Sequence, residues 1–316
     1  MNPAVLDALR NEGLLTERQH SLLTGIYSQK LFSLYYELRT MLYLGVLLFT
    51  TGVGILVYLN IETIGHQVII LALMVLTGLC FWYVARRRAP YSNGQVQSPG
   101  VLFDYILLLG CLLFTTVVGY LQFQYGLFGE HWEFGALLPA VACLASSYLF
   151  DHRGVLSIGI TGIGSWLGLT VTPLGLLESG QFHEGSLIET GLFFGLGLVA
   201  VALLLDRRGV KKHFTFTYLS FGANIFFIAC LYGLFLTHGD AGYLLATIAG
   251  VVGGILYARR EQSFFFLLIS SVFGYIGVTY MLGQFIEDPL VWMLYFLVSC
   301  GGVIYFLFHY KRFLSR

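Results

Sequence analysis

Residues 46–59 read VLLFTTGVGILVYL, and this stretch decides the class of fold. It is apolar almost throughout and does not alternate between polar and apolar residues, as a strand of a membrane β-barrel would. Its flanks extend it to an apolar run over 41–59, close to the roughly 20 residues that a helix needs to cross about 30 Å of hydrocarbon. A helix satisfies its own backbone hydrogen bonds in lipid. The stretch therefore predicts a transmembrane helix.

Nine further apolar stretches of this kind follow along the 316-residue chain. Hydrophobic residues make up 57% of the chain and charged residues only 11%, against about 25% charged residues in a typical soluble domain. A single water-soluble globule of this composition would expose large apolar patches. We therefore predict an all-α fold, a polytopic transmembrane helix bundle of about ten spans within 41–310. The expected spans are 41–59, 66–85, 101–120, 134–150, 154–171, 187–205, 214–236, 241–258, 263–283 and 290–310.

All 17 lysines and arginines fall at the termini or on alternate connections between these spans. The positive-inside rule, which is most reliable for short loops, then places both termini in the cytoplasm and requires an even number of crossings. We expect a multi-pass protein of the bacterial cytoplasmic (inner) membrane, with the lipid bilayer as its surroundings. The basic residues are Arg10, Arg18, Lys30, Arg39, Arg86, Arg87, Arg88, Arg153, Arg207, Arg208, Lys211, Lys212, Arg259, Arg260, Lys311, Arg312 and Arg316.

Residues 1–40 differ from the rest, because they are polar and amphipathic and contain no long apolar run. Thr16-Glu17-Arg18-Gln19 has the spacing of a capping box that begins a helix. We predict a short cytoplasmic helical hairpin over 1–40, and a basic cytoplasmic tail over 311–316. The hairpin either binds a protein partner or simply caps the bundle.

Polar groups within or beside the spans are the candidates for a ligand pathway, because lipid penalises them. Asn224 is strongly polar and lies near a span centre, where it is either a structural hydrogen-bonding group or a ligand contact. Asp104 lies about one turn inside the third span, and His66 begins the second. The densest polar and aromatic run is 121–135, which forms either an interfacial loop or one wall of a binding cleft. Its candidates are Gln122, Tyr125, His131 and Trp132.

Patterns that would indicate a metal site, a nucleotide site or a catalytic pair are absent from the sequence. His183-Glu184 lacks the second histidine of a zinc motif, because Leu187 stands there. No Gly-Lys-Ser/Thr loop occurs, and no Ser-His, Cys-His or paired-carboxylate motif stands out. Acidic and basic residues cancel, so net charge gives no indication of a nucleic-acid partner. We expect no metal, no cofactor, no catalytic residue and no nucleic acid.

Glycine pairs spaced four apart occur in several spans, among them Gly164/Gly168 and Gly191/Gly195. In lipid, small residues let helix backbones approach closely, and van der Waals packing then drives association. We predict that these glycines lie at helix–helix contacts.

Three ordered motifs resemble the bacterial DUF2157 family of predicted membrane proteins, whose molecular function is not established. EGLLTERQHSLLTGIY at 12–27 is similar to the family's N-terminal segment, and LGVLLFTTGVGILVYLN at 44–60 to its first hairpin. LLLGCLLFTTVVGYLQFQYGLFGEHWEFGALLPAV at 107–141 resembles its next hairpin, with Gln122, Tyr125 and Trp132 at matching positions. Ile61 and Pro139 stand where the family usually has tryptophan. The resemblance covers roughly 5–170 and implies a membrane protein, without implying a reaction.

Three functions are compatible with these observations. A transporter or permease for a small molecule or a lipid fits ten short-looped spans without a catalytic domain, with alternating access around a pocket near Asn224 and 121–135. A non-catalytic scaffold or subunit of an envelope complex would use residues 1–40. An intramembrane enzyme acting on a lipid or glycan would need two groups held within hydrogen-bond reach of the substrate.

Overall fold

The computed structural model describes residues 16, 17, 19, 35–59, 65–171, 184–286 and 288–314. Over these residues it contains ten α-helices, one short 3-10 helix and no strand, which confirms the all-α class. The chain divides into two compact units, Met1–Leu59 and Asn60–Arg316.

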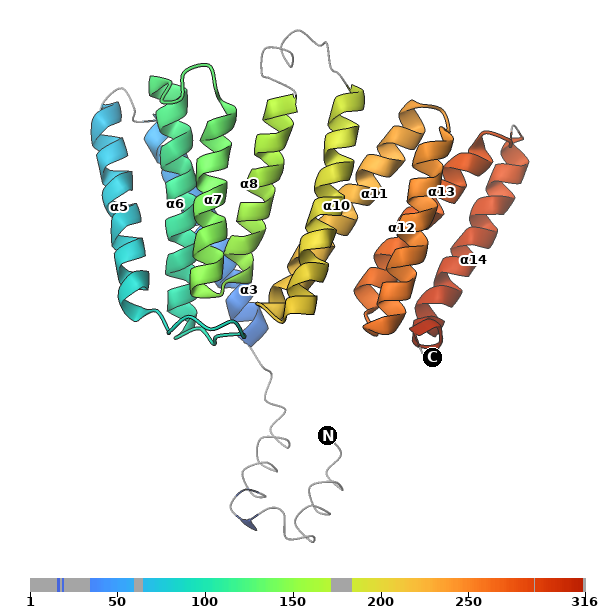
Figure 1. Cartoon of the computed structure of the whole chain (residues 1–316), viewed down its shortest axis with the longest axis horizontal. Coiled ribbons are helices and arrows are strands. Elements are labelled where there is room, and N and C mark those ends of the chain that lie inside the picture. The colour runs from blue at the N-terminus through green and yellow to red at the C-terminus, as the bar shows by residue number, and fades with distance from the viewer. Residues whose placement is uncertain are drawn as a thin grey trace. The chain divides into compact units, whose positions relative to one another are not determined.

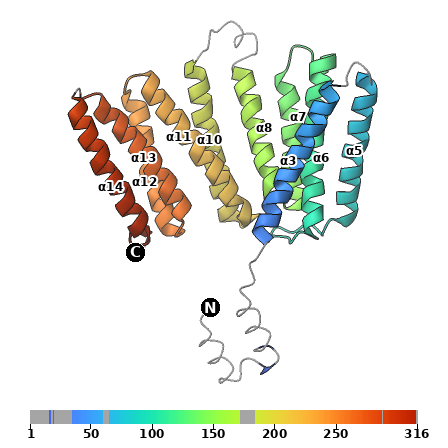
Figure 2. The same ribbon diagram turned by 180° about the vertical axis from the view of Figure 1, so that it is seen from behind.

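The first unit contains α3 (Tyr35–Leu59), a continuous helix that begins six residues before the predicted span (Figure 2). The hydroxyls of Thr50 and Thr51 donate to the carbonyls four residues earlier, at 2.8 and 2.9 Å, so these polar groups are satisfied inside the apolar helix. The capping box is confirmed, because Thr16 N donates to Gln19 Oε1 at 3.0 Å and Gln19 N donates to Thr16 Oγ1 at 3.4 Å. The remainder of the predicted hairpin lies outside the described residues.

The described residues of the second unit form nine α-helices, and each corresponds to one predicted span (Figure 1). Among the described residues, nine helices including α3 are long and apolar enough to cross a membrane, while α14 has a shorter apolar part, Pro289–Val303. The helices are α5 (His66–Arg87), α6 (Val101–Tyr125), α7 (Glu133–Phe150), α8 (Arg153–Val171), α10 (Glu184–Arg208), α11 (Thr215–Leu236), α12 (Ala241–Arg260), α13 (Phe264–Gly283) and α14 (Pro289–Leu314). The 3-10 helix η1 (Lys212–Phe214) precedes α11.

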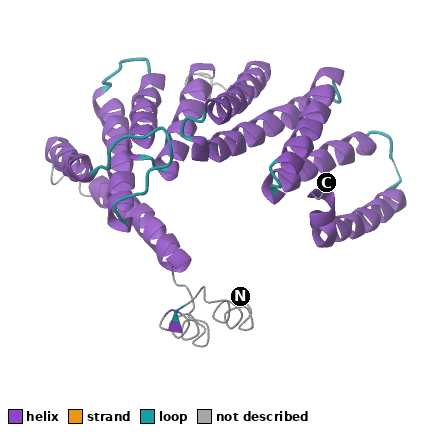
Figure 3. Cartoon of the chain, turned by 60° about the horizontal axis from the view of Figure 1, so that its bottom comes forward, coloured by secondary structure: helices purple, strands orange, loops and turns teal. Residues whose placement is uncertain are grey.

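The described lysines and arginines of the second unit all lie at one end of its helices, which we call the basic end. It holds the connections 88–100, 151–152, 209–214 and 261–263, at the bottom of Figure 1. Helices joined there pack closely as pairs: α5 with α6, α7 with α8, α10 with α11, and α12 with α13. The connection 88–100 is the longest of them and runs along the basic end (Figure 3). We call the other end of the helices the opposite end.

The main hydrophobic core lies in the half of the bundle next to the basic end. There Leu156 and Ile160 of α8 pack with the last turns of α10 and the first turns of α11 and α13. The α10 and α11 backbones touch, since a Cβ atom on Gly195 would lie 2.9 Å from the carbonyl oxygen of Gly222. Gly195 is therefore a packing glycine, as predicted. Gly168 is not, because a Cβ atom there would have no neighbour within 4 Å.

Candidate functional site

Gln122 lies in the last turn of α6, which runs five residues beyond the predicted end of that span. Its side chain is buried, and both ends of its amide hold the following loop. Nε2 donates to the carbonyl of Gly129 at 3.1 Å, and Oε1 accepts from Phe128 N at 2.7 Å. A loop folded around one buried amide explains why a polar residue stands at this depth. The amide orders the hairpin between α6 and α7.

The other candidates of the 121–135 run point outward. Tyr125 and Trp132 are exposed, and His131 contacts Glu133 Oε1 at 2.9 Å with 70% of its side chain exposed. Amphipathic rings at a helix end are typical of membrane interfaces. These side chains do not gather with Gln122 around a common space.

His66 and Asp104 take part in contacts at opposite ends of the bundle. His66 Nδ1 lies 2.6 Å from the hydroxyl of Tyr120, which joins the first turn of α5 to α6. Asp104 lies in the first turn of α6, where its Oδ1 accepts from Ser98 Oγ at 2.6 Å. Each contact fixes a helix end.

Asn224 lies on α11, and its amide Nδ2 donates to the carbonyl of Ser220 at 2.8 Å, one turn earlier on the same helix. The side chain is partly buried. Its neighbour Ile225 lines the groove described below, whereas Asn224 does not. The ligand roles of the seven candidate residues stay predictions.

A buried charged cluster at the basic end is the feature that the sequence analysis missed. Lys211 Nζ lies 3.1 Å from Asp151 Oδ2, and His213 Nε2 pairs with the other carboxylate oxygen. The exposed fractions of the Lys211 and Asp151 side chains are 1% and 3%. Asp151 follows α7 and the other two residues precede α11, so the cluster joins segments 60 residues apart. We call Asp151, Lys211 and His213 the charged cluster.

Local backbone geometry places Asp151 in this cluster. Asp151 ends α7 with φ 60°, a left-handed conformation that aspartate tolerates better than most residues, and its N–H bonds to the carbonyl of Ser147. His152 Nδ1 then accepts from Val155 N at 3.0 Å and caps the first turn of α8. The two residues thus end one helix and begin the next. The sequence did contain a signal for this cluster. The turn FDHRG at 150–154 places an aspartate at a helix end that is otherwise basic, where it can pair with a lysine or arginine.

Contacts with the 88–100 connection fix both the backbone and the side chain of Lys211. Its φ of 46° is unusual for lysine, its N–H donates to the carbonyl of Asn93 at 2.7 Å, and its ammonium lies 4.9 Å from the ring centroid of Tyr91. The sequence indicates only that Lys211 is one of the basic residues that define the topology. Its burial comes from the 88–100 connection, which covers it.

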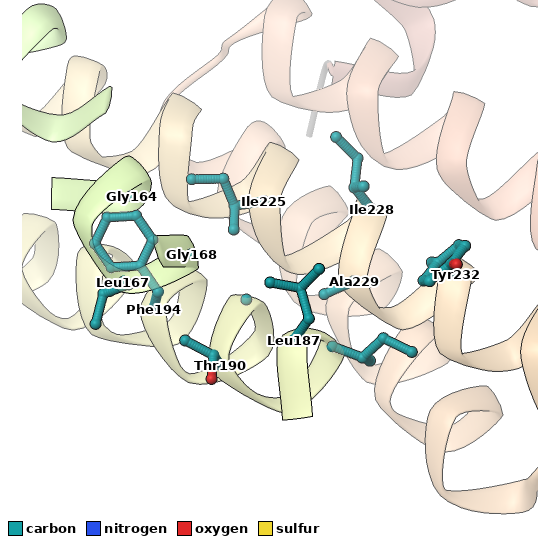
Figure 4. A pocket seen from close by; sticks show the side chains of 12 residues that line it. Gly164, Leu167, Gly168, Leu187, Thr190, Phe194, Ile225, Ile228, Ala229 and Tyr232 are labelled. Atoms are coloured by element: carbon teal, nitrogen blue, oxygen red, sulfur yellow. The ribbon is translucent and has the colours of Figure 1, made fainter. Parts of the chain in front are cut away.

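A lateral apolar groove of about 340 Å³ lies between α8, α10 and α11, in the half of the bundle next to the opposite end (Figure 4). Its polar side chains are Thr190, whose hydroxyl donates to Ser186 O at 2.8 Å, and Tyr232. The groove opens sideways, because Leu187 and Ile228 are exposed. Its lining residues are Gly164, Leu167, Gly168, Leu187, Ile188, Thr190, Gly191, Phe194, Ile225, Ile228, Ala229 and Tyr232.

A second groove, of about 490 Å³, lies between α13 and α14. Two hydroxyl pairs bridge these helices. Tyr275 lies 3.0 Å from Ser299, and Thr279 lies 2.5 Å from Tyr295. Across the described part of the chain, no three histidine, cysteine, aspartate or glutamate side chains gather as a metal site would require.

Comparison with known families bears on the first half of this architecture, from the N-terminal segment through α7 to the start of α8. Residues 7–156 match the DUF2157 family. The family is described as a predicted membrane protein, which agrees with the apolar helices found here. Neither the curated proteins nor the solved structures contain a significant match. The DUF2157 region includes Asp151 but neither Lys211 nor His213, so the charged cluster ties this region to the rest of the chain.

Proposed function

We propose that this membrane protein is a transporter of lipid-like molecules, and that the groove between α8, α10 and α11 binds an apolar chain. The observation that carries the proposal is the groove itself. It has a volume of about 340 Å³ and an almost wholly apolar lining, and it opens sideways. The three helices that form it are each long and apolar enough to span a membrane. Small-molecule sites measure about 300–1,000 Å³ and are mostly apolar. The neighbour of a lateral opening at this depth is hydrocarbon, so the occupant that enters it is an acyl chain.

The packing of the three helices supports this reading. The core next to the basic end joins α8, α10 and α11, and Phe194 and Ile225 belong both to its edge and to the groove lining. Towards the opposite end α8 and α10 separate (Figure 1). Gly168 and Gly191 line the groove and have no side chain that would fill it. The α13–α14 groove is less suited to the role, because only two helices form its walls.

The binding step is tested with a phospholipid that carries a photoactivatable diazirine in its acyl chain. The full-length protein is placed in vesicles of phosphatidylethanolamine and phosphatidylglycerol with a trace of the probe, and labelled peptides are identified. We expect labelling concentrated in α8, α10 and α11 at the groove. Gly168→Leu, which fills space where a Cβ atom meets nothing within 4 Å, should remove most of it.

Gly197→Leu is the matched control, because Gly197 is exposed on α10, has the same open surroundings and lies outside the groove. Labelling that is even over the whole lipid-facing surface, or that persists in Gly168→Leu, contradicts the assignment of the groove. Transport is then measured as movement of a fluorescent phosphatidylglycerol between leaflets. Specific labelling without such movement would favour the scaffold function instead.

We further propose that the basic end faces the cytoplasm of a bacterial inner membrane, in line with the positive-inside rule. Ser92 lies on the exposed face of the 88–100 connection. A cysteine there should react with an impermeant maleimide in inside-out vesicles and stay unlabelled in intact cells. The reverse pattern would contradict this orientation.

A further inference from the structure

The connection 88–100 is long for a loop inside a bundle, yet it is ordered by contacts with distant parts of the chain. Loops of about 12–15 residues without secondary structure are uncommon in compact domains and are usually functional or disordered. Here Val96 N donates to Asp151 Oδ2 at 2.5 Å, and the carbonyl of Asn93 accepts from Lys211 N at 2.7 Å. Both anchoring residues belong to the charged cluster.

The same carboxylate oxygen that accepts from the connection also meets the ammonium of Lys211. Asp151 Oδ2 therefore bonds to Val96 N and pairs with Lys211 Nζ, while Oδ1 pairs with His213. Lys211 Nζ also lies 3.5 Å from the carbonyl of Gly94. Loss of either charge leaves the other one buried beneath the connection, which is strongly unfavourable until water reaches it.

The connection lies close against the basic end of α6 and α7. Between it and the helices there remains a space of about 10 Å³, close to the size of one water molecule. Phe103, Leu149 and Phe150 line that space from the side of the helices. Access to the basic end of α6 and α7 thus requires movement of the connection.

Two residues of the charged cluster also have backbone angles that are uncommon for residues other than glycine. Asp151 and Lys211 both have left-handed φ values, 60° and 46°. Conformations of this kind persist where the surrounding contacts over-determine them, and they concentrate at switches and functional sites. The Lys211 backbone is the one that is bonded to the connection, because its N–H donates to the carbonyl of Asn93.

We propose that residues 88–100 form a strap that the charged cluster locks onto the basic end, and that separation of Asp151 from Lys211 releases the strap while the helices stay folded. The strap and Asp151 both belong to the DUF2157 region, and Lys211 belongs to the segment that precedes α11. The strap together with the ion pair therefore acts as a latch that joins this region to that segment. This inference goes beyond the proposed transport of lipid-like molecules and does not depend on it.

Amide hydrogen exchange measured by mass spectrometry, on the full-length protein in lipid nanodiscs, tests the latch. In Lys211→Met we expect peptides covering 88–100 to exchange at least about tenfold faster than in the wild type, because the buried Asp151 carboxylate loses its lysine partner. Peptides from α7, α8 and α11 should keep their wild-type rates. Lys212→Met is the matched control, since this neighbouring lysine pairs with Asp206 at the exposed surface, and it should leave the strap unchanged.

Two further variants keep the test decisive. Asp151→Asn/Lys211→Met removes both charges, so its strap should exchange more slowly than that of Lys211→Met. If Lys211→Met does not fold, Asp151→Asn carries the same test, because the amide keeps the shape of the side chain and one acceptor. Wild-type rates over 88–100 in the single variants would overturn the latch, and so would an equal increase over all neighbouring helices.

Discussion

The two ends of the second unit use the same kinds of side chain in contrasting ways. At the basic end Asp151 and Lys211 form a buried ion pair between segments 60 residues apart. At the opposite end His131 and Glu133 form a pair two residues apart, with exposed side-chain fractions of 70% and 24%. Burial makes the first pair a constraint between distant segments, whereas water and local flexibility leave the second with little effect.

Packing follows the same division. The hydrophobic core joins α8, α10, α11 and α13 next to the basic end, and α8 and α10 leave an apolar groove towards the opposite end. Among α8, α10 and α11, the helices are therefore closed by charge and core next to the basic end and leave a lateral groove towards the opposite end.

The Asp151–Lys211 pair should show a coupling energy of about 3 kcal/mol, near the upper limit for residues in contact. It is measured by a double-mutant cycle of Lys211→Met, Asp151→Asn and the double variant, with the free energy of opening taken from exchange of the Val96 amide. The cause is that each single variant removes the oppositely charged partner of a group that stays buried. A coupling below about 1 kcal/mol, typical of exposed pairs, would remove the contrast between the ends.

Gln122→Leu should lower the stability of the protein by about 1–3 kcal/mol, because it leaves Phe128 N and the Gly129 carbonyl without the buried amide that satisfies them. Thermal unfolding in nanodiscs measures the loss. Gln124→Leu, on an exposed face of the same helix, is the control and should be nearly neutral. Equal effects of the two variants would show that the amide does not order the hairpin.

The His131–Glu133 pair should show a much smaller coupling energy than the Asp151–Lys211 pair in a double-mutant cycle with His131→Ala and Glu133→Ala. Exposure and proximity in the chain both limit its contribution. Thermal unfolding at low salt and at high salt provides the measurement. A coupling equal to that of Asp151 and Lys211 would mean that burial does not distinguish the two ends.

Much of the fold follows from the sequence, because hydrocarbon imposes length and apolarity on each helix. The spans predicted at 241–258 and 263–283 agree with α12 and α13 to within two residues. Helix ends at the interface are less constrained, so α3 begins earlier and α6 ends later than predicted. The capping box at Thr16 and Gln19 was predictable because it is local.

The site was harder to predict, because it depends on pairs that are distant in sequence. Lys211 has the sequence pattern of an interfacial anchor, and only its approach to Asp151 and the strap reveals a buried charge. His66 likewise finds its partner Tyr120 on the next helix. The groove depends on where α8 and α10 separate, which the glycine spacing alone does not determine, since Gly195 packs and Gly168 does not.

A cryo-electron microscopy map of the full-length protein in lipid nanodiscs would show the strap and the groove in the same molecule. We predict continuous density for residues 88–100 over Asp151 and Lys211, and an elongated density of acyl-chain width in the groove between α8, α10 and α11. A map in which side chains close that groove would rule out the acyl-chain site, and one in which Lys211 faces solvent away from Asp151 would rule out the latch.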